Sequence, residues 1–168
     1  MPQASCRQGG IHTEIEKGWT ASRIMGGNTK VLVAEDEIDI GKNYKIILES
    51  RNHQVTLAKD GEECVLFFDE AFRKLQVEHS NTDEKSPFDI VVLDFRMPKK
   101  DGVAVARHIL SMCPVQKVIF ATAYTLDVLD GLMKVQLGIE VLQKPFDLDA
   151  FVAMVEDFGS RPLAKQKA

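Results

Sequence analysis

The apolar residues of this chain fall into short segments that alternate with longer stretches of helical spacing. Five such segments predict strands over 31–34, 55–58, 90–93, 118–121 and 139–142. Short runs of consecutive apolar residues are typical of strands covered on both faces, as in a parallel sheet flanked by helices. The predicted fold is therefore an α/β, doubly wound, five-stranded parallel sheet with helices on both faces.

Helical spacing fills the intervals between the predicted strands. Helices are predicted over 37–51, 60–77, 101–112, 126–137 and 147–158. The first helix would bury the side chains of Ile40, Tyr44, Ile47 and Leu48 in the core. The second helix would be capped by Asp60, and its inner face would carry Val65, Phe68, Phe72 and Leu75. The polar stretch 78–87 predicts a loop.

The two ends of the chain differ in composition from its centre. Residues 1–28 have no sustained apolar pattern and contain two Gly-Gly pairs, so we expect a flexible N-terminal tail before a single domain over 29–158. A short basic tail over 159–168 is too small for an output domain. No segment approaches the roughly 18 apolar residues of a membrane-spanning helix. We therefore expect no membrane insertion.

Cysteine use and charge narrow the function further. Cys6, Cys64 and Cys113 are an odd number without disulfide or zinc spacing, which favours a reducing, cytoplasmic location. Residues 30–158 hold 15 basic and 23 acidic side chains, a net charge of −8. Because nucleic-acid binding depends on neutralising phosphates, we expect no direct nucleic-acid partner. A magnesium ion or a basic protein surface fits this charge better.

Chemically active side chains follow four of the predicted strands. They are Glu35, Asp36 and Glu37 after the first, Asp94 after the third, Thr122 after the fourth and Lys144 after the fifth. In open α/β sheets ligands bind outside the carboxyl ends of the strands, so these residues are expected to converge. Clustered carboxylates repel one another unless a hard cation such as Mg²⁺ lies between them. A carboxylate there could accept a phosphoryl group, with Lys144 and Thr122 holding its oxygens.

Four motifs make the chain recognisable over roughly 29–158. The motifs are Val31 to Glu37 with its acidic pair, Val91 to Gly102 with its Met-Pro and Asp-Gly turn, Ala121-Thr122-Ala123, and Lys144-Pro145-Phe146. With these motifs the chain resembles the receiver domain of two-component response regulators. The resemblance implies a flavodoxin-like sheet with strand order 2-1-3-4-5.

The resemblance also implies a role for each matching residue. Asp94 would be the phosphorylated aspartate, and Mg²⁺ (or Mn²⁺) would be bound by Asp36, Asp94 and the backbone carbonyl of Arg96. Glu35 would act through a metal-bound water. Thr122 would move to contact the phosphoryl group and Lys144 would pair with it, while the small Ala123 would leave the phosphoryl group room.

The chain departs from the family pattern at two positions. Val141 stands three residues before Lys144, where the family often has an aromatic residue that reports phosphorylation; Tyr124 and Phe146 are candidate substitutes. Arg96 stands two residues after the acceptor, where smaller polar residues are common. Its guanidinium could pair with phosphoryl oxygens or with a carboxylate, or it could point to solvent. With Tyr124 it would line the path of the water that hydrolyses the phosphoprotein, which predicts a long phosphoryl lifetime.

The resemblance implies a signalling module and not an enzyme with a separate substrate. A histidine kinase or phosphotransfer protein would supply the phosphoryl group, and the output would be a downstream protein contact. A homodimer would use the face made by 126–137, 139–142 and 147–158. The alternatives are a phosphorelay intermediate and a magnesium-dependent phosphohydrolase with an aspartyl-phosphate intermediate, although such hydrolases usually place an Asp where Arg96 stands. No G-x-G-x-x-G follows the first strand, which argues against dinucleotide binding.

Overall fold

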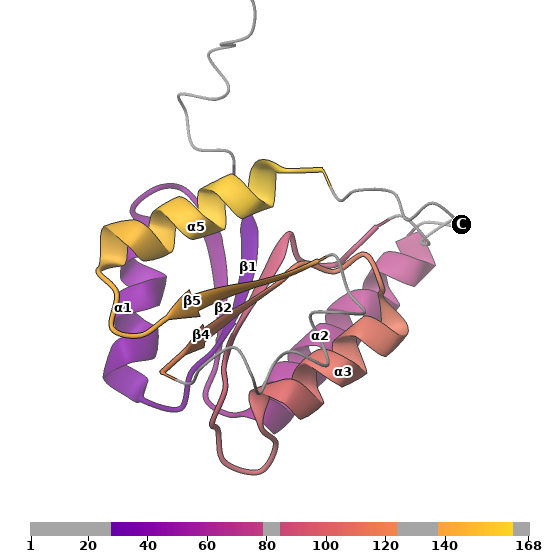
Figure 1. The fold of residues 1–168 in the computed structure, drawn as a ribbon. Coiled ribbons are helices and arrows are strands. Elements are labelled where there is room, and N and C mark those ends of the chain that lie inside the picture. Colours follow the sequence, from indigo (N-terminus) through magenta and orange to yellow (C-terminus); the bar gives the residue numbers. More distant parts are fainter. Residues whose placement is uncertain (1–27, 79–84, 124–137, 163–168) are drawn as a thin grey trace, which may run out of the picture.

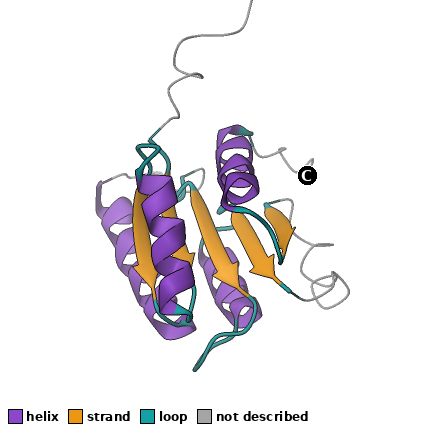
Figure 2. Cartoon of the chain, turned by 90° about the vertical axis from the view of Figure 1, so that its left-hand side faces the viewer, coloured by secondary structure: helices purple, strands orange, loops and turns teal. Residues whose placement is uncertain are grey.

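Five parallel strands form one sheet in the computed structural model, which describes residues 28–78, 85–123 and 138–162. The strands are β1 (Lys30–Ala34), β2 (Gln54–Ala58), β3 (Ile90–Asp94), β4 (Val118–Thr122) and β5 (Ile139–Gln143). Their order is β2-β1-β3-β4-β5, and every neighbouring pair is parallel. Figure 2 shows the strand arrows pointing the same way. The predicted fold class and strand order are confirmed.

Helices cover both faces of the sheet (Figure 1). On one face lie α1 (Ile38–Glu49) and α5 (Leu148–Ser160). On the other lie α2 (Gly61–Glu78) and α3 (Gly102–Met112). The helix predicted over 126–137 lies outside the described residues, and so do residues 1–27, 79–84 and 163–168.

Aspartates mark the starts of three helices. The side chains of Asp101 and Asp147 accept hydrogen bonds from Ala104 N and Ala150 N at 2.7 and 2.6 Å, so both residues are N-caps and not, as predicted, first helical residues. Asp60 caps α2 in the same way. Such caps satisfy backbone N–H groups that have no partner within the helix.

Three helix ends also differ from the predicted bounds, and one of them is that of α2, which ends at Glu78, one residue beyond its predicted end. The helix predicted over 37–51 ends at Glu49, because the chain then turns through Asn52, whose φ is 67°. The last helix continues two residues beyond its predicted end, to Ser160.

The side chains of each strand alternate between two hydrophobic cores. The core between the sheet and α2/α3 includes Phe68 and Phe120, and the core between the sheet and α1/α5 includes Leu48 and Phe151. The predicted inner face of α2 is confirmed at Phe68 and Phe72, which are buried, while Val65 and Leu75 are half-buried. Because helices cover both faces of the sheet, the strands consist mainly of consecutive apolar residues and do not alternate apolar with polar ones.

Lys117 joins the start of β4 to the end of α5. Its Nζ donates hydrogen bonds to the carbonyl oxygens of Phe158 and Gly159, at 2.9 and 2.8 Å, and to that of Arg161. These carbonyls lie at the C-terminus of a helix, where a cation is favoured by the helix dipole. Lys117 therefore acts as a cap from outside the helix.

Replacing Lys117 by Met should destabilise the fold by about 1.5–3 kcal/mol, the range for hydrogen bonds to a charged group. Urea unfolding would measure this change, and amide hydrogen exchange should rise most at the end of α5. Lys45→Met is the matched control, because Lys45 forms an exposed pair with Glu49 at 3.6 Å and such pairs contribute little. Equal stability losses in the two variants would contradict the capping role.

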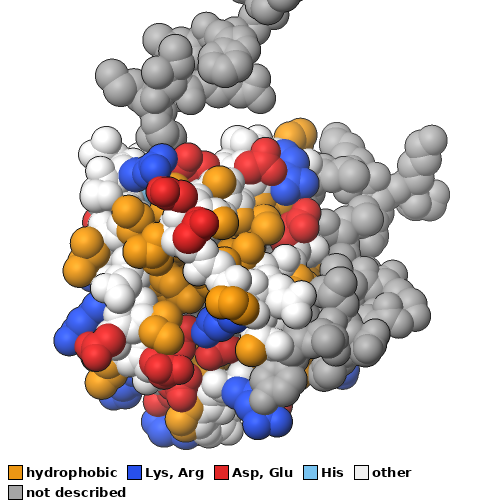
Figure 3. Space-filling model, turned by 60° about the vertical axis from the view of Figure 1, so that its left-hand side comes forward, with side chains coloured by type: hydrophobic (Ala, Val, Ile, Leu, Met, Phe, Trp, Pro, Cys, Tyr) orange, Lys and Arg blue, Asp and Glu red, His pale blue; other side chains and the backbone are white. Residues whose placement is uncertain are grey.

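The side of the molecule that carries α1 presents apolar side chains among charged ones (Figure 3). Ile38 and Ile46 of α1 are 63% and 65% exposed, and Leu148 of α5 is 39% exposed.

Among the described residues, no helix combines the length and the apolar character needed to cross a bilayer. Cys64 and Cys113 are buried free thiols.

Candidate functional site

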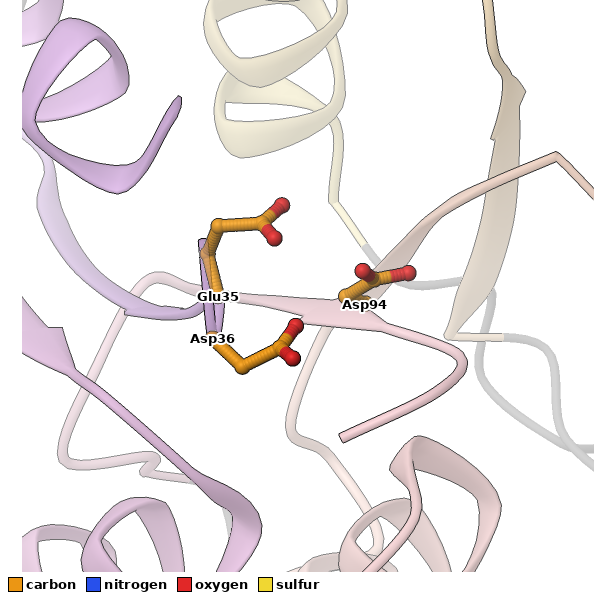
Figure 4. A group of neighbouring side chains, drawn as sticks. All are labelled: Glu35, Asp36 and Asp94. Carbon is orange, nitrogen blue, oxygen red and sulfur yellow. The ribbon is translucent and has the colours of Figure 1, made fainter. Parts of the chain in front are cut away.

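Three carboxylates meet at the carboxyl edge of the sheet (Figure 4). β1 and β3 are neighbours, with Ala34 opposite Leu93, so Glu35 and Asp36 follow β1 directly beside Asp94 at the end of β3. One oxygen from each of the three carboxylates lies within 4.8 Å of the others. The convergence expected from the strand ends is therefore present in the fold.

Lys144 brings a positive charge into this group from the end of β5. Its Nζ lies 3.1 Å from Glu35 Oε2 and 3.4 Å from Asp94 Oδ2. The backbone N–H of Lys144 donates to the carbonyl oxygen of Thr122 at 2.7 Å, which extends the β4–β5 pairing to the edge. The lysine is thus positioned by the sheet itself.

The backbone also orients the carboxylates. Glu35 is 3% exposed, and its Oε1 accepts the N–H of Glu37 at 3.3 Å. Asp94 Oδ1 accepts the N–H of Phe95 at 2.6 Å. Asp36 and Asp94 are half-buried, so the group faces solvent on the Asp36 and Asp94 side.

The electrostatics of the site favour added positive charge. Burial raises the pKa of Glu35, and the nearby Asp94 raises it further, against the opposing effect of Lys144. Partial burial lowers the pKa of Lys144, but Glu35 and Asp94 together outweigh this and leave that pKa raised. Both shifts favour the protonated forms, chiefly through burial at Glu35 and through the neighbouring Glu35 and Asp94 carboxylates at Lys144.

This donor set fits a hard divalent cation. Mg²⁺ prefers oxygen ligands and is usually held by one or two carboxylates, keeping several waters. Asp36 and Asp94 offer half-exposed carboxylates on the open side of the group. The two positive charges of the ion would offset the negative charge that remains when Lys144 is counted against the three carboxylates.

The remaining predicted site residues lie around this group. Thr122 is fully buried at the end of β4, and the next residue, Ala123, is exposed. Arg96 is exposed in the loop between β3 and α3. Tyr124 lies outside the described residues. The roles assigned to these side chains stay predictions.

The loop after Asp94 is closed at its base by a close backbone approach. Gly102 N donates to Phe95 O at 3.0 Å. A Cβ atom on Gly102 would lie 2.2 Å from the carbonyl oxygen of Asp94. A side chain at this position would therefore displace the backbone of Asp94.

Val141 and Phe146 lie on opposite faces of the sheet. Val141 packs against the α2/α3 core, whereas Phe146 packs against the α1/α5 core, with its ring 6.0 Å from those of Tyr44 and Phe151. Phe146 therefore does not occupy the space that an aromatic residue at position 141 would fill. The other candidate substitute, Tyr124, lies outside the described residues.

Sequence reasoning missed two neighbours of the site. Tyr44 was predicted only as a core residue, yet the charges of Lys144, Glu35 and Asp94 act on it; burial is the main reason that its pKa rises to about 12. Lys99 was not singled out, although it has a φ of 67° and contacts Asp60. Apolar spacing assigned Tyr44 to the inner face of its helix but carried no sign of the nearby charges, and no sequence signal marked Lys99.

Known proteins with similar sequences include a response regulator receiver protein and several transcriptional regulators. The response regulator receiver protein CpdR of Brucella abortus is 28% identical over 127 residues, which cover 76% of this chain and 93% of CpdR. The transcriptional regulatory protein RprY of Bacteroides fragilis is 27% identical over 84% of this chain, but the match covers 54% of RprY. The chain thus spans about half the length of that relative.

Solved structures agree with this likeness. A response regulator receiver domain protein from Clostridium thermocellum is 27% identical, with a TM-score of 0.61 over 79% of this chain and 95% of its own. A chain of the CheX–CheY–BeF3–Mg²⁺ complex from Borrelia burgdorferi is 26% identical, with a TM-score of 0.63 over 79% of this chain and 90% of its own. The model of the response regulator receiver domain family matches residues 31–156, from β1 into α5. Since that match takes in the whole sheet and every site residue named above, this chain belongs to the response regulator receiver domain family.

Proposed function

We propose that this chain is a phosphorylation-switched receiver whose phosphoacceptor is Asp94. The observation that carries the proposal is the meeting of Asp94 with Glu35 and Asp36 on one side and with Lys144 Nζ, 3.4 Å away, on the other. A histidine kinase or a phosphotransfer protein would be the donor. Signalling would follow through changed protein contacts, without turnover of a separate substrate.

The transfer is a displacement at phosphorus. A carboxylate oxygen of Asp94 forms a bond to phosphorus while the P–N bond to the donor imidazole breaks, and the imidazole leaves with the electron pair and takes up a proton. Lys144 would pair with a phosphoryl oxygen after Asp94 loses its charge. The hydroxyl of Thr122 is the second group proposed to contact the phosphoryl oxygens.

Mg²⁺, or Mn²⁺ in its place, is the proposed cofactor. Asp36, Asp94 and the backbone carbonyl of Arg96 would hold it, and Glu35 would act through a water. When bound, the ion would neutralise charge that develops on the phosphoryl oxygens. Glu35 keeps its carboxylate oriented through the Glu37 N–H and the Lys144 ammonium.

The downstream contacts are proposed for the face made by residues 126–137, β5 and α5, of which the structure describes β5 and α5. Both elements connect directly to the Lys144–Phe146 segment, so a change at Lys144 reaches them through the backbone. Homodimers through this face are part of the proposal. A cytoplasmic location agrees with the free thiols of Cys64 and Cys113.

A phosphotransfer assay tests the proposed function. Autophosphorylated histidine kinases would be mixed with this chain, and the label would be followed from kinase to receiver with Mg²⁺ and again after its removal with EDTA. We expect transfer within minutes from a cognate kinase in Mg²⁺ only. Label that never leaves any kinase, together with no reaction with a small-molecule phosphodonor, would contradict the proposal.

We expect the phosphorylated form to be long-lived if Arg96 and Tyr124 restrict the attacking water. Arg96→Asn and Tyr124→Ala should each speed dephosphorylation, and the double variant should speed it most; each factor of ten corresponds to about 1.4 kcal/mol in the barrier. The decay of the phosphoprotein signal measures this rate. Arg107→Asn, at an exposed position within α3, is the control for loss of a positive charge. Unchanged decay in all three site variants would show that these side chains do not restrict the attacking water.

A further inference from the structure

The loop between β3 and α3 contains a strained turn centred on Lys99. The φ of Lys99 is 67°, and Lys100 N donates to Pro98 O at 2.7 Å, which closes a three-residue γ-turn. A γ-turn with positive φ at its centre is rare and strained. Lysine is also an unusual residue for positive φ, which glycine and asparagine adopt more readily. Such strain persists only where surrounding contacts maintain it.

The side chain of Lys99 forms an ion pair with the start of α2. Lys99 Nζ lies 2.7 Å from Asp60 Oδ2 and 3.6 Å from Glu62 Oε2. The side chain of Asp60 is only 6% exposed, and its other oxygen accepts the N–H of Glu63 at 2.8 Å. The hydrogen bond from Lys99 is the main reason that the pKa of Asp60 is lowered. An exposed pair would contribute little, but here one partner is a fixed, buried carboxylate.

A backbone contact lies beside the ion pair. A Cβ atom on Gly61 would be 2.0 Å from the carbonyl oxygen of Lys100, so the start of α2 and the tip of the loop touch through their main chains. The base of the same loop is closed by the hydrogen bond from Gly102 N to Phe95 O. Arg96 lies between the fixed base and the fixed tip.

We propose that Lys99 is a positioning residue: by pairing with Asp60 it holds the loop 95–100 in its strained turn and so fixes the backbone of Arg96, which follows Asp94 by two residues. This inference rests on the proposed function in one respect, namely that the Arg96 carbonyl is a ligand of the divalent ion. Lys99 itself would touch neither the ion nor the phosphoryl group.

The sign of one effect separates positioning from simple electrostatics. Removing a lysine near a cation site lowers the local positive charge, which by itself strengthens binding of Mg²⁺. If Lys99 positions the loop, Lys99→Met should instead weaken Mg²⁺ binding, because a carbonyl ligand is no longer held in place. Asp60→Asn should do the same, and the double variant should be no weaker than the single variants.

The test measures two quantities in parallel. Titration calorimetry with MgCl₂ at fixed ionic strength gives the Mg²⁺ affinity, and amide hydrogen exchange without metal reports the order of residues 95–100. Lys99→Met is expected to weaken Mg²⁺ roughly three- to tenfold, about 0.7–1.4 kcal/mol, and to raise exchange in this loop. Lys59→Met is the matched control, because Lys59 pairs with Glu63 at 3.7 Å at the same helix start but does not join it to the loop.

A second variant distinguishes loss of the ion pair from misfolding of the loop. Lys99→Asn removes the ion pair but tolerates positive φ better than Met, so it should weaken Mg²⁺ less than Lys99→Met does. Unchanged or tighter Mg²⁺ binding by Lys99→Met, with unchanged exchange, would overturn the positioning role. If the wild-type chain binds no Mg²⁺, the proposed function fails instead, and the metal-free exchange comparison then decides whether Lys99 holds the loop.

Discussion

Replacing Asp94 by Asn should abolish phosphorylation of this chain. The wild-type protein, treated with a small-molecule phosphodonor and Mg²⁺, should gain one phosphoryl group, seen as an increase in intact mass. The Asn amide is nearly isosteric and can still accept the N–H of Phe95, which now bonds to Asp94 Oδ1. It lacks the anionic oxygen that attacks phosphorus, so we expect loss of the reaction without loss of the fold.

A matched control for this result lies at the other end of the same strand. Asp89 immediately precedes β3, and its Oδ2 accepts the N–H of Lys30 at 2.7 Å. Asp89→Asn makes the same chemical change far from the carboxyl edge and should leave the mass increase intact. A full mass gain in Asp94→Asn would show that another residue is the acceptor.

Replacing Asp36 by Ala should remove most of the Mg²⁺ affinity. We expect a loss of at least about tenfold, or about 1.4 kcal/mol, because one of the few carboxylates available to the ion disappears. Without metal the same change should raise the free energy of unfolding, since it relieves repulsion within a group whose carboxylate oxygens lie within 4.8 Å. Thermal unfolding with and without Mg²⁺ measures both effects. In the wild type, Mg²⁺ at ten times its Kd should add about 1.4 kcal/mol.

The affinity for Mg²⁺ should also depend on pH. The raised pKa of Glu35 means that this carboxyl takes up a proton at a higher pH than usual. Protons and the ion compete for the same negative charge, so the affinity should fall as the pH is lowered into the acidic range.

Asp39→Ala, which removes an exposed carboxylate from the first turn of α1, is the control for Asp36→Ala. Equal Mg²⁺ binding by Asp36→Ala and Asp39→Ala would contradict the proposed metal site.

The sheet and the meeting of the carboxylates were predictable because they depend on patterns that sequence carries locally. Apolar runs such as 90–93 mark strands covered on both faces, and parallel strands bring their carboxyl ends to one edge. The positions of Asp94, Asp36 and Lys144 follow from those two facts. The caps at Asp101 and Asp147 moved the helix starts by one residue only.

Contacts between segments distant in sequence were not predictable in the same way. The Lys117 cap on α5 joins residues 41 or more positions apart, and the Lys99–Asp60 pair joins residues 39 apart. Both depend on the direction of a flexible lysine side chain, which neither propensity nor periodicity determines. The positive φ of Lys99 was hidden for a related reason, because lysine is not a residue type that signals it.

The stacking of Tyr44 on Phe151, with ring centroids 4.4 Å apart, makes this tyrosine a built-in spectroscopic reporter. Its ring is packed in the α1/α5 core while the charges of Lys144, Glu35 and Asp94 act on it. With its pKa near 12, the phenol stays neutral at working pH, so its signal does not change through its own ionisation. The chain has only two tyrosines. Fluorotyrosine labelling would therefore give a two-line ¹⁹F spectrum, in which the line from Tyr44 reads the charge of the site without any added dye.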